Sequence, residues 1–85
     1  MNDSEKIMAF LNAHKEHEQT RQVLHHLFFR GPITQLIAVE EYGVTRLASI
    51  IWKLRYRHGF YIVADIRSGR NRWGRPANYA VYRLA

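Results

Sequence analysis

A run of closely spaced arginines near the C-terminus is the most chemically distinctive feature of the sequence. Residues 67–75 are RSGRNRWGR, so four guanidinium groups lie among small, turn-forming residues and one tryptophan. Guanidinium groups bind phosphate oxygens and can enter a narrow, electronegative minor groove. We therefore predict nucleic-acid contacts from Arg67, Arg70, Arg72, Trp73 and Arg75. A solvated loop is the alternative, although a tryptophan among arginines usually has a partner.

A second set of polar side chains follows helical spacing over residues 45–57. One side of a helical wheel carries a core-facing stripe of Val44, Leu47, Ile51, Leu54 and His58. The opposite side carries Thr45, Ser49, Trp52, Lys53 and Tyr56, and it is flanked by Arg46 and Arg57, next to Ile50. We predict DNA contacts from Thr45, Arg46, Ser49, Lys53, Tyr56 and Arg57. Thr45 and Ser49 can approach bases closely, and Arg46 can hydrogen-bond both O6 and N7 of guanine. An ordinary amphipathic surface helix is the alternative.

The positive charge is concentrated in the second half of the chain. Of the 13 Lys and Arg residues, nine lie in residues 43–85, where Asp65 is the only acidic residue. This asymmetry favours a polyanionic partner, with nucleic acid first and an acidic membrane surface second. A basic surface that serves solubility is the alternative. Arg55 differs from the other cations because it lies at the edge of the buried stripe, so we expect a structural role for it.

Several function classes have no support in the composition or the motifs. The 85 residues include no cysteine, which excludes disulfides and thiolate metal sites. The five histidines show no ligand spacing, so we expect no metal site and no cofactor. No nucleophile–base pair, phosphate-binding loop or paired-carboxylate site is present, so we expect neither an enzyme nor a small-molecule substrate. Without a membrane-length apolar run or a signal peptide, the sequence predicts a cytoplasmic protein with no membrane partner.

Periodicity and turn-forming residues predict the elements of the first half of the chain. We expect a helix within residues 1–17, capped by Asp3 or Ser4, and a second helix that has Thr20 as its N-cap. Gly31-Pro32 stops this second helix. Thr34 is then predicted to cap a helix over residues 35–42. This third helix should bury Leu36, Ile37 and, as an open alternative, Val39, before Gly43 supplies a turn.

The second half is predicted to end in a β-hairpin. β-Branched and aromatic residues predict strands over 60–66 and 77–84, joined by a long turn over 67–76. The order of elements predicts an α+β winged helix-turn-helix, with a three-helix core, a C-terminal hairpin wing and an extra N-terminal helical segment. We expect residues 1–19 to form an N-terminal extension and residues 20–85 to form the DNA-binding domain.

One stretch of the sequence resembles a known family. The residues that carry the resemblance are GPIT at 31–34, YGVTRLAS at 42–49, IWKLR at 51–55 and NYAVYRL at 78–84. They are similar to a family of small phage and prophage helix-turn-helix proteins, over roughly residues 20–85. The resemblance implies a winged-helix DNA-binding domain encoded by a phage or prophage. Ile50 departs from the pattern, which commonly has a basic residue there, and residues 1–19 have no counterpart in it.

These observations favour sequence-specific binding of double-stranded DNA, as a transcriptional regulator or a recombination accessory factor. The alternative is a protein-interaction module that uses the N-terminal helix and Trp52 as an apolar patch for a host transcription factor or another protein. RNA binding ranks last because no RNA-binding motif is present. A homodimer through the N-terminal segment, a lid on the core, and a segment that binds another protein are the open alternatives for residues 1–19.

Overall fold

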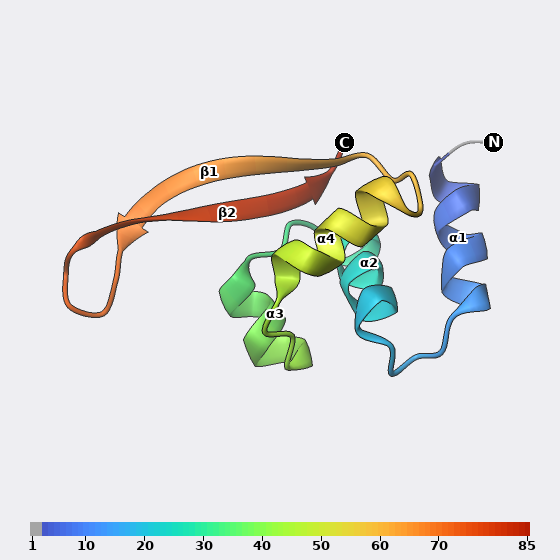
Figure 1. The fold of residues 1–85 in the computed structure, drawn as a ribbon, viewed down its shortest axis with the longest axis horizontal. Helices are drawn as coiled ribbons and strands as arrows, with labels where there is room; N and C mark the ends of the chain where they lie inside the picture. The colour runs from blue at the N-terminus through green and yellow to red at the C-terminus, as the bar shows by residue number, and fades with distance from the viewer. Residues whose placement is uncertain (1–2) are drawn as a thin grey trace.

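The computed structural model describes residues 3–85 as four helices followed by one antiparallel β-hairpin (Figure 1). The elements are α1 (Asp3–Ala13), α2 (Gln19–Phe29), α3 (Gln35–Tyr42), α4 (Leu47–Tyr56), β1 (Ile62–Arg70) and β2 (Pro76–Leu84). The helices gather into one body, and the hairpin extends from it past α3 (Figure 1). This arrangement confirms the predicted α+β winged helix-turn-helix.

A helix lies within residues 1–17 as predicted: α1 ends at Ala13, and residues 1–2 lie outside the described part of the chain. Its apolar side chains Ile7, Phe10 and Leu11 are buried in the core of the same chain. Lys6 Nζ donates to the Gly59 carbonyl at 2.8 Å. The apolar side of α1 is therefore packed within its own chain, and a homodimer through this segment stays a prediction.

Helix α2 starts at Gln19, two residues before the start that an N-cap at Thr20 would give. Its N-cap is Glu18, whose side chain makes no capping hydrogen bond, so the prediction of Thr20 as the N-cap is wrong. Thr20 is the second residue of the helix and lies within its first turn. The C-terminal end is as expected: Arg30 and Gly31 both donate backbone hydrogen bonds to the His26 carbonyl, and Gly31 has φ of 108°.

Helix α3 has the predicted bounds and the predicted cap. The Thr34 hydroxyl accepts a hydrogen bond from the Ile37 amide at 3.2 Å. The predicted burial is wrong for Leu36, which is 65% exposed, and Val39 is also exposed. Ala38 is instead the fully buried residue of this helix, because α3 is a short helix that contacts α2 through one narrow side.

Helix α4 is shorter than the predicted span of 45–57. Val44, Leu47, Ile51 and Leu54 are buried as predicted. Ile50 is also buried, at 6% exposed, so its expected place at the flank of the outer face is wrong. The core around α4 covers a wider arc than the helical wheel indicated, because α1, α2 and β1 all contribute side chains to the same cluster.

The hairpin has longer strands and a shorter turn than predicted. Its strands pair from Ile62 with Leu84 to Arg70 with Pro76, so the turn of 67–76 shrinks to residues 71–75. The short extended stretch before α3 joins β2, because Ile33 and Tyr82 exchange two backbone hydrogen bonds of 2.9 Å. This bridge anchors the base of the hairpin to the helical body.

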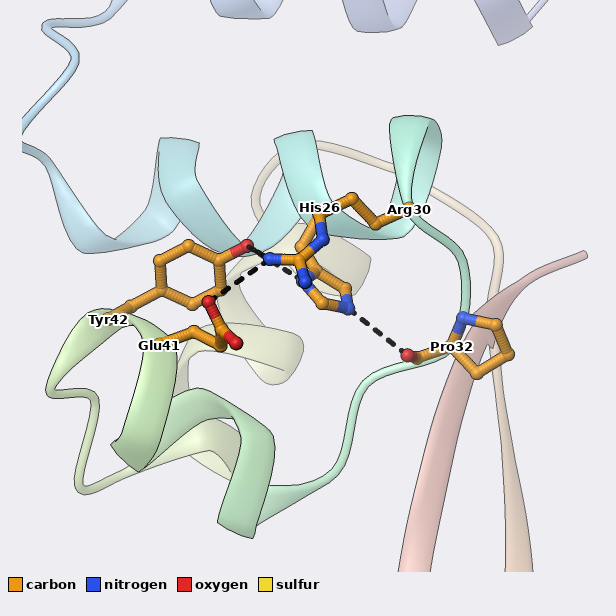
Figure 2. Close-up of polar contacts among 5 residues, drawn as sticks. All are labelled: His26, Arg30, Pro32, Glu41 and Tyr42. Atoms are coloured by element: carbon orange, nitrogen blue, oxygen red, sulfur yellow. Dashed lines mark hydrogen bonds and ion pairs between the residues drawn. The ribbon is translucent and has the colours of Figure 1, made fainter.

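A buried histidine links α2 to α3 (Figure 2). The His26 side chain lies with Nδ1 2.7 Å from the Tyr42 hydroxyl and Nε2 3.2 Å from the Pro32 carbonyl. A carbonyl can only accept, so Nε2 carries the proton and the Tyr42 hydroxyl donates to Nδ1. Arg30 donates to the Tyr42 oxygen at 3.4 Å and pairs with Glu41 at 3.3 Å. Burial lowers the pKa of His26 below its usual value, which keeps the ring neutral in this network.

Candidate nucleic-acid interface

The turn between α3 and α4 fixes the direction in which α4 leaves the helical body. Gly43 takes the left-handed conformation, with φ of 67°, and its amide closes α3. The Gln35 side chain then spans the turn: its Nε2 donates to the Val44 carbonyl at 2.9 Å, and its Oε1 accepts from the Leu47 amide at 3.0 Å. Gln35 therefore caps the first turn of α4 from the neighbouring helix.

This cap from Gln35 replaces one that the chain does not supply locally. The N-cap position of α4 is Arg46, whose side chain makes no capping hydrogen bond. Arginine cannot accept a hydrogen bond from an amide, whereas the glutamine carbonyl can. Sequence reasoning did not identify Gln35, and the available signal was the lack of Ser, Thr, Asp or Asn at the residue that precedes α4.

The outer side of α4 presents a mixed aromatic and polar surface. Ser49, Trp52, Lys53 and Tyr56 are exposed, as the helical wheel predicted. Trp52 is 54% exposed and Tyr56 is 69% exposed, and their rings lie with centroids 5.4 Å apart. Four residues at helical spacing therefore form one continuous surface that the core does not use.

The remaining predicted residues of this set flank the helix. Thr45 and Arg46 are exposed, but both precede α4, because the helix starts at Leu47. Arg57 is exposed at the opposite end, where it is the C-cap. A helix of this length spans about 15 Å, so Arg46 and Arg57 cannot contact the same base pair.

Arg55 has the structural role that the sequence indicated. Its Nε and Nη2 atoms both donate to the Ile62 carbonyl, at 2.9 Å and 2.7 Å. The guanidinium group thereby joins α4 to the first residue of β1. Arg83 is also engaged, because its Nε lies 3.0 Å from Oδ2 of Asp65. These two cations are less available to a partner than the net charge suggests.

The tip of the hairpin, residues 71–75, is an ordered turn. The Asn71 carboxamide oxygen accepts hydrogen bonds from the amides of Trp73 and Arg75, at 3.0 Å and 3.1 Å. The Gly74 amide donates to the Asn71 carbonyl, and Gly74 has φ of 76°. Between Asn71 and Arg75, residues 72–74 form a three-residue hairpin loop in which Gly74 takes the left-handed position. Asn71 lies in the predicted turn region of residues 67–76, as a turn signal would, but the sequence did not indicate that its side chain bonds the turn amides.

The predicted arginines of the hairpin divide between the strands and the tip. Arg67 and Arg70 lie in β1, and their separation of three residues places them on opposite faces of the hairpin. Arg72 and Arg75 lie in the tip, where the Arg72 guanidinium is 5.4 Å from the Trp73 ring centroid. Arg70 Nη1 donates to the Gly74 carbonyl at 2.7 Å, so this side chain also holds the tip.

A groove separates the hairpin from α3 and α4. Its volume is about 790 Å³, and its walls come from α3, the start of α4, and both strands. The lining includes Leu36, Ala48, Arg70 and Asn78. Of the residues predicted to contact DNA, Arg70 lines this groove, and on the helix side the lining includes Ala48, which directly precedes Ser49.

The described residues offer little support for other kinds of site. Within residues 3–85, no three His, Asp or Glu side chains lie close enough together to hold a metal ion. In the same range, no helix combines the length and the apolar character of a membrane span. Among these residues, every buried side-chain nitrogen and oxygen has a hydrogen-bond partner.

Comparison with known proteins places this arrangement in a family. Residues 18–85 match the model of a family described as the winged helix-turn-helix domain, so the match covers α2 to β2 and leaves α1 outside. No curated protein and no solved structure gave a significant match. The fold suggests a DNA partner, because winged helix-turn-helix domains place a helix and a hairpin against duplex DNA. With most of its length matched, the chain belongs to the winged helix-turn-helix domain family.

Proposed function

We propose that this protein binds specific sequences in double-stranded DNA, with α4 in the major groove and the hairpin against the phosphate backbone or the minor groove. One observation carries the proposal: Ala48 of α4 and Arg70 of the hairpin line the same groove of about 790 Å³. A duplex that received α4 would bring a sugar-phosphate strand to this groove. Base contacts would then come from the helix and orientation from the hairpin.

The distribution of charge supports the same docking. The side chains of six of the cations in residues 43–85 make no hydrogen bond or ion pair within the described residues, namely those of Arg46, Lys53, Arg57, Arg67, Arg72 and Arg75. The acidic residues Glu40 and Glu41 lie on α3, and Glu41 is neutralised by Arg30. Phosphate contacts from such cations release counterions, so binding should weaken steeply as salt rises.

The residues differ in the contact that each can make. Arg46 lies beside the first turn of α4, the end that contacts base edges in this class of domain, so we assign it a base contact with Thr45 and Ser49. Lys53, Tyr56 and Arg57 lie further along the helix, where the groove wall is phosphate. On the hairpin, Arg72 and Arg75 at the tip are the principal phosphate contacts, with Arg67, Arg70 and Trp73 beside them.

The biological role that we propose is regulation of transcription or assistance in recombination, in a phage or prophage. This part of the proposal is supported by the resemblance carried by residues 31–34, 42–49, 51–55 and 78–84. The alternative role in binding a host protein required an apolar patch that joins the N-terminal helix to Trp52. That patch has less support, because Ile7, Phe10 and Leu11 are buried.

Selection of bound sites from random duplexes, followed by affinity measurements at several salt concentrations, tests the proposal. The wild type should select one sequence. Arg46→Ala should then bind selected and unrelated duplexes with more similar affinity. Arg72→Ala should weaken binding to all duplexes. It should also reduce the salt slope, which is the slope of the logarithm of the binding constant against the logarithm of the salt concentration, by about one in magnitude.

A matched control removes the same charge from elsewhere. Lys15→Ala changes an exposed residue in the loop between α1 and α2, and it should bind DNA as the wild type does. Absence of any binding to duplex DNA at low salt would overturn the proposed function. Copurification with a host protein in that case would favour the protein-interaction role.

A further inference from the structure

The outer surface of α4 has an unusual set of side chains for a helix that contacts base pairs. The bidentate hydrogen bonds that distinguish purines come from Arg, Lys, Asn or Gln. Helix α4 contains no Asn or Gln, and its only arginine, Arg55, is bound to the Ile62 carbonyl. Apart from Lys53, the exposed residues are Ala48, Ser49, Trp52 and Tyr56. The helix therefore offers mainly apolar and aromatic contacts along its length.

Four of these residues, Ala48, Ser49, Trp52 and Lys53, line a shallow, open hollow of about 330 Å³. Ala48 and Trp52 are four residues apart, as are Ser49 and Lys53, so each pair lies on adjacent turns of the helix. A methyl group and an indole ring form the apolar walls. The other two lining residues, Ser49 and Lys53, carry a hydroxyl group and an ammonium group.

Trp52 lies beside a second exposed aromatic side chain. The Tyr56 ring lies 5.4 Å from the Trp52 ring at an interplanar angle of 49°, one turn further along α4. The two rings therefore lie next to each other on the exposed surface of α4. Trp52 is nevertheless 54% exposed, so a partner that covered it would remove a large apolar surface from water.

The apolar and polar side chains of the hollow match one feature of the major groove. Among the base edges exposed there, the thymine 5-methyl group is the only apolar one, and the adjacent O4 atom accepts a hydrogen bond. We propose that the hollow binds a thymine, with Ala48 and Trp52 in contact with the methyl group and Ser49 or Lys53 donating to O4. This inference rests on the proposed function, because it requires α4 to lie in the major groove.

Replacement of single thymines by deoxyuridine tests the inference, because deoxyuridine lacks the methyl group and keeps the hydrogen-bonding edge. In the site selected from random duplexes, at least one such replacement should weaken wild-type binding about fourfold, the effect of burying one methyl group. Trp52→Ala should bind the thymine and deoxyuridine duplexes equally. Ala48→Ser, which places a hydroxyl group in the apolar wall, should also reduce the difference.

Arg72→Ala is the matched control, because it should weaken binding to both duplexes and keep their ratio. Circular dichroism checks that Trp52→Ala and Ala48→Ser remain folded, as their exposed positions predict. Equal wild-type affinity for the thymine and deoxyuridine duplexes, or a selected site without thymine, would overturn this inference and leave DNA binding intact. Unchanged discrimination in Trp52→Ala would also overturn it. Failure to bind any duplex would overturn the proposed function and this inference together.

Discussion

The Gln35 carboxamide and the Leu47 amide form a hydrogen bond of 3.0 Å between the first residue of α3 and the first residue of α4. The same side chain donates to the Val44 carbonyl, so it engages both ends of the turn that separates the helices. Gln35 therefore joins the turn to the first residue of α4, in addition to the backbone bond from the Val44 amide to the Ala38 carbonyl and the burial of Val44 and Leu47. This connection matters because any contact between α4 and a duplex requires a fixed angle of approach.

We predict that Gln35→Ala lowers the free energy of unfolding by about 1 kcal/mol, the usual cost of removing a helix cap. It should also weaken binding to the selected duplex, although Gln35 carries no charge. Urea denaturation and titration with DNA measure the two effects. Gln19→Ala, at the exposed first residue of α2, should change neither quantity. Wild-type stability in Gln35→Ala would show that the cap is not needed.

A second prediction concerns His26 and pH. Burial lowers the pKa of His26 in the folded protein, with the Arg30 and His25 charges acting in the same direction and the Pro32 hydrogen bond and Glu41 opposing them. Near pH 6.5, His26 therefore binds a proton more readily in the unfolded chain than in the folded chain. The free energy of unfolding should therefore fall as pH decreases below about 6.5. The fall should end once His26 is protonated in the folded protein too.

Urea denaturation between pH 5 and 8 measures this dependence. His58 adds to the same slope, because burial together with His14, Arg57 and Lys6 lowers its pKa. His26→Gln should retain the hydrogen bonds to Tyr42 and Pro32. Its free energy of unfolding should depend less steeply on pH than that of the wild type. His17→Gln, at an exposed position, should give the wild-type slope. A slope unchanged by His26→Gln would contradict the prediction.

The order of the elements was predictable because local signals agree with the packing. The Thr34 cap, the Gly43 turn and the buried stripe of α4 each follow from residue type and spacing, and the structure confirms all three. The lengths of the strands were harder to predict. Arg67 and Arg70 have no strand preference of their own, and cross-strand pairing carries β1 through them to Arg70.

The number of long-range contacts, which the sequence does not show, explains two errors in predicted burial and the missed cap of α4. A helical wheel gives one stripe of fixed width, whereas Ile50 is buried because α4 is covered from several directions. Likewise, Gln35 lies 12 residues from Leu47, a separation at which no local pattern indicates a hydrogen bond. Leu36 has the hydropathy of a core residue, yet α3 has so few neighbours that its side chain stays exposed.

The packing of α1 gives a third prediction. Leu11 is 3% exposed and belongs to the same core as α2 and α4, whereas Met8 is 41% exposed on the same helix. Leu11→Ala should lower the free energy of unfolding by about 2–5 kcal/mol, because it removes buried apolar contacts and leaves a cavity. Met8→Ala should change it by less than about 0.5 kcal/mol. If urea denaturation gave an equally small change in the free energy of unfolding for Leu11→Ala and Met8→Ala, the packing of α1 would not stabilise the folded chain.

The last prediction separates the order of the hairpin tip from its charge. Asn71 is uncharged, but its carboxamide oxygen holds the amides of Trp73 and Arg75. Asn71→Ala should therefore let the tip adopt other conformations, and each phosphate contact would then cost additional conformational entropy. Affinity for duplex DNA should fall several-fold while the salt slope stays at its wild-type value, because no cation is lost. Arg72→Ala, by contrast, should reduce both affinity and slope. Asn71→Ala should leave the unfolding midpoint unchanged, since the tip is exposed and far from the core. A salt slope that fell equally in both variants would show that Asn71 acts through the number of phosphate contacts and not through their preorganisation.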